Sequence, residues 1–163
     1  MEIRKATLQD YEVIHKIALI TWDATYSKIL TTEQLEYMLD MMYSHKAIEE
    51  QIAIKGHEFL IIEEGGISLG FASFEINYRS QTTKLHKLYV LPETHGKGAG
   101  RALLTVVENA ARRHTNDKLV LNVNRFNPAL HFYLKCGFEN LGDDNIDIGN
   151  GYVMEDYLMQ KQL

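Results

Sequence analysis

The chain has 163 residues, about the length of one domain, and its 45% hydrophobic and 24% charged residues with two prolines exclude a disordered chain. The single cysteine, Cys136, excludes an internal disulfide framework and a cysteine-based metal cluster. Because the formal net charge is −5 and lysine and arginine form no cluster, we expect no binding to nucleic acid.

The first part of the chain predicts a strand and two helices. The strand covers residues 1–6, and Thr7 with Asp10 forms a capping-box pattern ahead of the first helix. Thr31 with Gln34 gives the same start signal for the second helix. Apolar residues recur at helical spacing after each signal, so both helices are expected to bury one face.

A third helix is predicted over residues 45–55, and the pattern then changes to strands. Its expected inward residues are Ile48, Ile52 and Ile54. The β-rich runs 57–63 and 67–78 flank the turn Gly65-Gly66 and predict a hairpin. The later expected elements are a strand over 82–90, a helix over 100–114, a strand over 118–123, a short helix after Asn127-Pro128 and two final strands. This order predicts a single α/β domain over residues 1–163, with a mixed sheet.

A glycine-rich segment joins the predicted strand 82–90 to the helix after it. It reads His95-Gly96-Lys97-Gly98-Ala99-Gly100-Arg101. Glycine permits positive φ and close backbone approach, and a helix N-terminus offers unpaired N–H groups and partial positive charge. The segment therefore predicts a phosphate-binding loop, to which Lys97 and Arg101 add charge.

Two common phosphate-binding patterns do not match this segment. A Walker loop requires Ser or Thr after its lysine, where this chain has Gly98. A G-x-G-x-x-G fingerprint would require a third glycine where Arg101 or Leu103 stands. The segment instead resembles the acyl-CoA pyrophosphate loop of GCN5-related N-acetyltransferases, [QR]-x-x-G-x-[GA], with His95 in place of Gln or Arg.

A second motif of that family lies about 30 residues downstream. Its pattern is N-x-x-A-x-x-F-Y-x-x-x-G-F, and the matching residues here are Ala129, Phe132, Tyr133, Gly137 and Phe138. Phe126 stands where the pattern has asparagine, and Asn127 follows it. The resemblance covers nearly the whole chain. It implies a three-layer α-β-α fold, whose mixed, mostly antiparallel sheet has a splayed cofactor-binding strand, and acetyl-CoA as co-substrate.

Acetyl transfer to an amine requires a deprotonated amine, a stabilised oxyanion and a proton for the leaving thiolate. The resemblance places Tyr133 beside the sulfur of coenzyme A, as the acid that protonates it; a tyrosine packed in the core is the alternative. The resemblance also implies that the backbone of Leu88, Tyr89 and Val90 binds the pantetheine arm and the thioester carbonyl. Asn127 is the remaining candidate for contact with the cofactor.

Two residues are candidates for the base that accepts the proton of the amine. His86 lies two residues before Leu88, and an imidazole with a pKa near 6.5 accepts protons at neutral pH. Glu75 on the preceding strand is the other candidate. Trp22 and Tyr26 lie where the family binds its acceptor, so an aromatic contact with a cationic amine is the hypothesis for them. No H-x-x-x-H pair is present, and no metal is predicted.

The sequence as a whole predicts an acetyl-CoA-dependent N-acetyltransferase that acts on a primary amine of a small molecule. The closing stretch 147–155 resembles the bacterial branch related to polyamine N-acetyltransferases, so a polyamine is one candidate acceptor. A peptide amine, N-terminal or lysine, is an alternative acceptor, and a non-catalytic acyl-CoA sensor is an alternative function. The chain has no run of ~18 apolar residues and no secretory signal, so we expect a cytoplasmic protein, and the resemblance suggests a homodimer.

Overall fold

In the computed structural model, which describes residues 1–163, polar side chains begin the early helices where the sequence predicts. Thr7 and Asp10 form a complete capping box at a short 3₁₀ turn, Leu8–Asp10, which leads into α1 (Tyr11–Tyr26). Thr31 accepts a hydrogen bond from the backbone N–H of Gln34 at the start of α2 (Thr32–Tyr43). Ser44 caps α3 (His45–Ala53) in the same way. These hydrogen bonds satisfy backbone donors that a helix N-terminus otherwise leaves unpaired.

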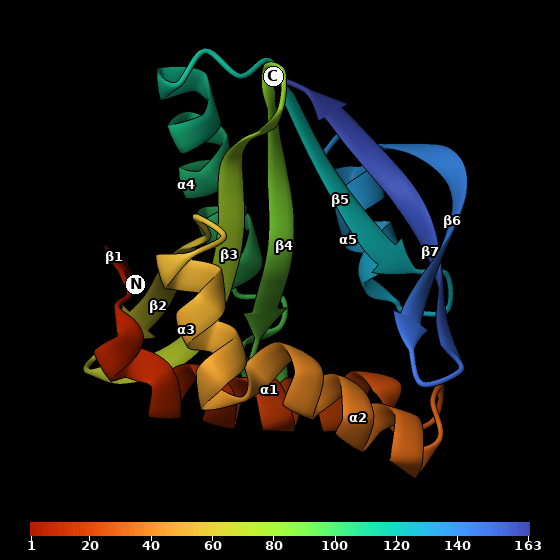
Figure 1. Cartoon of the computed structure of the whole chain (residues 1–163). Helices are drawn as coiled ribbons and strands as arrows, with labels where there is room; N and C mark the ends of the chain where they lie inside the picture. The colour runs from red at the N-terminus through yellow and green to blue at the C-terminus, as the bar shows by residue number, and fades with distance from the viewer. The chain divides into compact units, whose positions relative to one another are not determined.

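The chain packs as two compact units, the first made of residues 1–75 and 85–107 and the second of residues 76–84 and 108–163. In the first unit, β1 (Glu2–Lys5), β2 (Glu58–Glu64) and β3 (Ile67–Arg79) pair antiparallel, and β4 (Thr82–Val90) follows β3. Figure 1 shows α3 in front of these strands and α4 (Ala99–Arg113) behind them.

The second unit is built around β5 (Lys118–Asn124), whose whole length pairs antiparallel with β7 (Tyr152–Gln162). The strand β6 (Glu139–Gly149) forms a hairpin with β7, and α5 (Ala129–Lys135) lies between β5 and β6 in the chain. The first residues of β4, Thr82–Lys84, pair parallel with β5.

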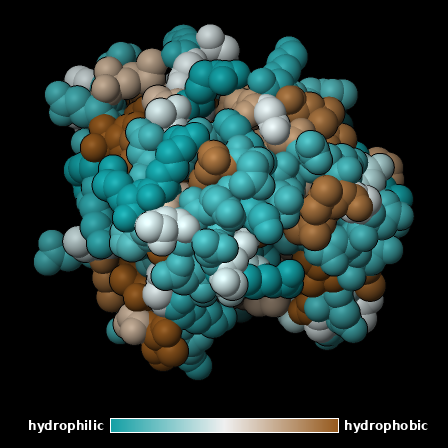
Figure 2. Space-filling view, turned by 90° about the horizontal axis from the view of Figure 1, so that it is seen from above, coloured by the Kyte–Doolittle hydropathy of each residue, from teal (hydrophilic) through white to brown (hydrophobic).

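The strand order β1-β2-β3-β4-β5-β7-β6 confirms the predicted α/β fold with a mixed, mostly antiparallel sheet. The inward face of α4 is formed by Leu103, Leu104 and Val107, which are buried. One predicted core residue is wrong: Ile54 is 79% exposed, because α3 ends at Ala53 and the helical spacing no longer applies after it. The face seen in Figure 2 is largely hydrophilic, with small separate hydrophobic patches.

Candidate active site

The glycine segment leaves an exposed loop in front of α4. Gly96 and Gly98 have φ values of +79° and +86°, which L side chains rarely adopt. A Cβ atom at either glycine would have no atom within 4 Å, so the backbone there faces open space. The first backbone hydrogen bond of α4 runs from the N–H of Ala102 to the carbonyl of Gly98. The N–H groups of residues 99–101 come before it and have no acceptor within the helix. This geometry suits a pyrophosphate.

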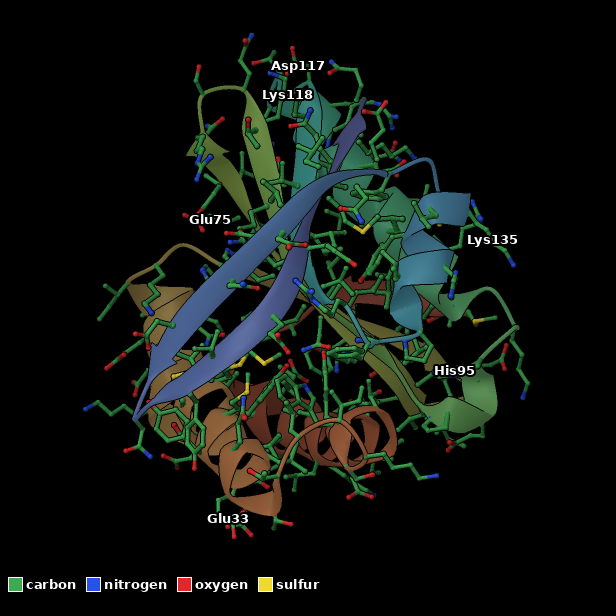
Figure 3. The ribbon with its side chains drawn as sticks, turned by 90° about the vertical axis from the view of Figure 1, so that its right-hand side faces the viewer. Glu33, Glu75, His95, Asp117, Lys118 and Lys135 are labelled. Atoms are coloured by element: carbon green, nitrogen blue, oxygen red, sulfur yellow. The ribbon has the colours of Figure 1, made fainter.

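Thr94 and His95 hold the loop against the end of β4. The buried Thr94 donates its hydroxyl to the carbonyl of Leu91 at 2.6 Å, and its own carbonyl accepts from the N–H of Lys97. The His95 ring Nε2 lies 3.2 Å from the carbonyl oxygen of Val90. Figure 3 labels His95 in this turn between β4 and α4. The histidine that departs from the family pattern therefore ties the loop to its strand. The role of Thr94 was missed because a lone threonine carries no motif.

A glycine on β3 allows close backbone approach to the last residues of β4. A Cβ atom at Gly70 would lie 2.6 Å from the carbonyl oxygen of Tyr89 and 2.7 Å from Cγ1 of Val90. Any side chain at position 70 would therefore displace the predicted pantetheine-binding stretch of β4. The N–H of Leu91 donates to the carbonyl of Leu69, which closes this end of the β3–β4 pair.

In the second unit, the predicted acid Tyr133 lies on α5 and is 7% exposed. Its ring packs edge-on against Phe132 and Phe138, with ring centroids 5.2 and 5.6 Å apart. The side-chain oxygen of Asn127 accepts from the N–H of Ala129, so it serves the turn that begins α5. Gly137, with a φ of +93°, ends α5 as predicted.

The two candidate bases contact each other in the first unit. His86 Nε2 lies 2.8 Å from Glu75 Oε2, and His57 Nε2 lies 3.5 Å from the same oxygen. The two imidazole rings stack with centroids 3.9 Å apart. All three side chains are partly exposed. The sequence did not indicate His57, although the predicted hairpin gives a signal: β2 and β3 pair Glu58 with Phe74, so residue 57 comes beside residue 75.

The side chains of the His57–Glu75–His86 cluster are also of the types that could hold a metal ion. One ligand atom from each side chain lies within 4.8 Å of the others. Imidazole nitrogen and carboxylate oxygen are ligands of zinc. The absence of a helical H-x-x-x-H pair does not exclude this group, because His57 immediately precedes β2 and the other two residues lie on β3 and β4. In Figure 3, Glu75 is labelled well apart from His95.

The aromatic residues expected at the acceptor site lie in the core of the first unit. Trp22 is 1% exposed, and its indole N–H donates to the Tyr43 hydroxyl at 3.1 Å. Tyr26 is buried against Trp22. Burial raises the pKa of Tyr43 far above its ordinary value. The neighbouring Lys87 is buried as well, and desolvation lowers its pKa to about 7, with Lys55 adding a smaller like-charge effect.

Comparison with known proteins shows the family of the chain. A family model described as "Acetyltransferase (GNAT) domain" matches residues 26–159. The uncharacterized N-acetyltransferase YuaI of Bacillus subtilis is 29% identical over 159 residues, which cover 94% of this chain and 88% of that protein. The spermidine N(1)-acetyltransferase of Thermoplasma acidophilum is 28% identical over 160 residues, covering 95% and 96%.

The fold is also similar to that of solved structures. The PaiA N-acetyltransferase from Thermoplasma acidophilum, in complex with coenzyme A, superimposes with a TM-score of 0.84 and 26% identity, covering 99% of this chain and 98% of that one. The chain therefore belongs to the GNAT family of acetyltransferases. It is an N-acetyltransferase with acetyl-CoA as co-substrate, in keeping with relatives solved with coenzyme A or acetyl-CoA bound. None of its helices combines the length and apolar character needed to span a membrane.

Proposed function

We propose that this enzyme transfers the acetyl group of acetyl-CoA directly to a primary amine of a small molecule, with a polyamine as one candidate. The observation that carries this proposal is the exposed glycine loop before α4, combined with a histidine–carboxylate pair on β3 and β4. The similarity to a spermidine acetyltransferase supports a polyamine. Residues 1–163 would then act as one N-acetyltransferase domain, in the cytoplasm and as a homodimer.

The roles proposed for the residues follow from their chemistry. The loop from His95 to Arg101 binds the pyrophosphate through its N–H groups and through the charges of Lys97 and Arg101. The backbone of Leu88, Tyr89 and Val90 binds the pantetheine arm and aims an N–H at the thioester carbonyl. Asn127 contributes a contact with the cofactor at the start of α5. Trp22 and Tyr26 contribute to the site that binds the acceptor amine.

The proton transfers proposed for the reaction balance as follows. In the proposed mechanism, His86 donates its Nε2–H to the Glu75 carboxylate, 2.8 Å away, and its Nδ1 is the proton acceptor. That nitrogen takes the proton of the amine as the new C–N bond forms at the acetyl carbon. The C–S bond breaks, and the Tyr133 hydroxyl gives its proton to the sulfur. The products are an N-acetylated amine and the thiol of coenzyme A, and the His86 imidazolium and the Tyr133 phenolate return to their starting forms by proton exchange with water.

Gly98→Val is expected to raise the KM for acetyl-CoA at least tenfold. A side chain at this position would occupy the open space where the loop backbone meets the pyrophosphate. Steady-state kinetics with acetyl-CoA as the varied substrate measure the effect.

Gly66→Val is the matched control for backbone strain. Gly66 has a similar φ of +78° and no atom within 4 Å of its would-be Cβ, but it lies in the β2–β3 turn. The Gly66→Val variant should lose about as much stability as Gly98→Val and should keep the wild-type KM for acetyl-CoA. An unchanged KM in folded Gly98→Val would place the cofactor elsewhere.

A histidine base predicts a specific pH dependence. In the wild type, kcat/KM should rise with pH through a limb that reports the deprotonation of the His86 imidazolium. His86→Ala should remove this limb and slow the reaction at neutral pH. Glu75→Gln, which keeps the shape without the basicity, is the comparison. If the limb survives in His86→Ala and vanishes in Glu75→Gln, the roles are reversed; if it survives in both, neither side chain is the base.

A panel of amines tests the acceptor class, with release of the coenzyme A thiol as the readout. Small primary amines and polyamines should be acetylated faster than peptide N-termini or peptide lysines. Faster reaction of the peptides would make the enzyme a peptide acetyltransferase. Binding of acetyl-CoA without turnover of any amine would indicate a sensor.

A further inference from the structure

The His57–Glu75–His86 cluster lies wholly within the first unit, on neighbouring parts of its sheet. His57 immediately precedes β2, Glu75 lies on β3 and His86 lies on β4. These strands are neighbours in the order β2-β3-β4, and the β2–β3 register pairs Glu58 with Phe74, which brings residue 57 beside residue 75. Strands hold side chains more precisely than loops do, so the sheet positions the three groups relative to one another.

The three side chains bring two nitrogen atoms to one oxygen atom. Nε2 of His86 and Nε2 of His57 lie 2.8 and 3.5 Å from the same atom, Oε2 of Glu75. In a tetrahedral zinc site, with metal–ligand bonds of about 2.0–2.2 Å, two ligand atoms lie about 3.4 Å apart. The two observed distances lie on either side of this value, and one ligand atom from each residue lies within 4.8 Å of the others. Small side-chain rotations therefore bring all three groups to bonding distance of one ion.

A metal ion can reach these atoms from the solvent. The side chains of Glu75 and His86 are 26% and 18% exposed, and that of His57 is 9% exposed. The proposed acetyl transfer uses only His86, as the base, and Glu75, as its hydrogen-bond partner. It gives no role to His57, although this imidazole shares the carboxylate oxygen and stacks on His86 with ring centroids 3.9 Å apart. The second imidazole is more than an acid–base pair requires.

We propose that His57, Glu75 and His86 bind one zinc ion, through the two Nε2 atoms and a carboxylate oxygen. Two imidazoles and one carboxylate are a ligand set that zinc accepts, with its fourth position left to water. Calcium and magnesium bind through oxygen ligands, so the two imidazole nitrogens select against them. The imidazole nitrogens favour a transition-metal ion instead.

Zinc bound at this site switches the enzyme off, and this part of the inference rests on the proposed function. In the proposed mechanism, Nε2 of His86 carries the ring proton and Nδ1 accepts the proton of the amine. A neutral imidazole that ligates a metal through Nε2 carries its proton on Nδ1 instead. The zinc-bound enzyme therefore lacks the accepting nitrogen, and the Glu75 carboxylate is bound to the metal as well. Zinc is thus a reversible inhibitor that acts at the base.

Isothermal titration of zinc chloride into the full chain tests the site directly. We expect one zinc ion per chain in the wild type. His57→Phe, which keeps a ring stacked on His86 and removes both nitrogen atoms, should bind zinc at least tenfold more weakly. Glu75→Gln should weaken binding in the same direction, and it replaces His57→Phe if that variant does not fold. His131→Gln is the matched control, because it removes an exposed histidine from α5, and it should bind zinc as the wild type does.

Two results of this titration would overturn the site. Equal affinity of the wild type and His57→Phe would show that the ion is bound by other residues. A loss of affinity in His131→Gln as large as that in His57→Phe would show that zinc binds to surface histidines without a defined site.

Kinetics separate a failure of the metal site from a failure of the proposed function. The initial rate is measured as the N-acetylated product of a monoamine, because the free thiol of coenzyme A itself binds zinc. Zinc chloride should inhibit the wild type, and EDTA should restore its rate. Half-inhibition should require at least tenfold more zinc in His57→Phe, whatever the basal rate of that variant.

The combined results have distinct meanings. An enzyme that acetylates amines and binds no zinc would reject the site and leave the proposed function standing. Zinc that binds through His57 without lowering the rate would support the site and reject His86 as the base. Zinc binding that depends on His57, in a protein that acetylates no amine, would support the site and reject the proposed function.

Discussion

Replacing Tyr133 by phenylalanine is expected to lower kcat by roughly 10²–10⁴-fold, the range for loss of general acid catalysis. The ring of Tyr133 packs between Phe132 and Phe138, and phenylalanine keeps those contacts. What the variant lacks is the hydroxyl proton for the departing thiolate. A phenol with a pKa near 10 can protonate a thiolate whose conjugate acid has a pKa near 8.5 only when it is held beside the sulfur.

The affinity for acetyl-CoA should change little in Tyr133→Phe, because the proposed pyrophosphate contacts lie in the glycine loop. Tyr11→Phe is the matched control, since it also removes one phenolic hydroxyl, here one that contacts His15 on α1. Single-turnover kinetics with saturating acetyl-CoA separate the chemical step from binding. Turnover of Tyr133→Phe near that of the wild type would show that the thiolate leaves unaided or takes its proton from another group.

The parts of the site that could be predicted are those that depend on local sequence. The glycine loop follows from the spacing of Gly96 and Gly98 before a helix, and both have the positive φ that such spacing implies. Helix caps at Thr7 and Thr31 depend on residues three positions away and were predicted for the same reason. Ile54 was misassigned because a helical pattern does not show at which residue the helix stops.

The parts that escaped prediction depend on pairing between strands. His86 and Glu75 were weighed as rival bases, whereas the structure joins them in one hydrogen-bonded pair and adds His57. The hairpin register places residue 57 beside residue 75, but the contact with His86 on β4 depends on the pairing of a further strand.

Lys87 is another residue whose environment could not be predicted, because a lysine in a strand is ordinarily taken to face solvent. In the structure it is 5% exposed and donates to the side-chain oxygen of Gln51 at 2.7 Å. Its ammonium also lies over the rings of Tyr43 and Phe59. Gln51 lies on α3. The positive charge of Lys55 disfavours the ammonium form of Lys87 further. No carboxylate offsets the burial.

The enzyme is therefore expected to become more stable as the pH rises from about 7.5 to 9.5. Burial lowers the pKa of Lys87 to about 7 in the folded chain, against 10.5 ordinarily. Between these values the unfolded chain binds one proton more than the folded chain, so the free energy of unfolding rises by about 1.4 kcal/mol per pH unit. The cost of burying the ammonium is fully present below pH 7 and is relieved as the pH rises.

Urea unfolding at several pH values, in the wild type and in Lys87→Met, measures this contribution. The wild type should gain roughly 2–3 kcal/mol between pH 7.5 and 9.5 relative to Lys87→Met, in which the slope from this residue is absent. Lys46→Met, which removes an exposed lysine of α3, should keep the slope of the wild type. Identical pH slopes in the wild type and Lys87→Met would show that Lys87 keeps its proton when the chain folds. In that case, water or a carboxylate would have to contact the buried Lys87 ammonium beside the Gln51 side chain.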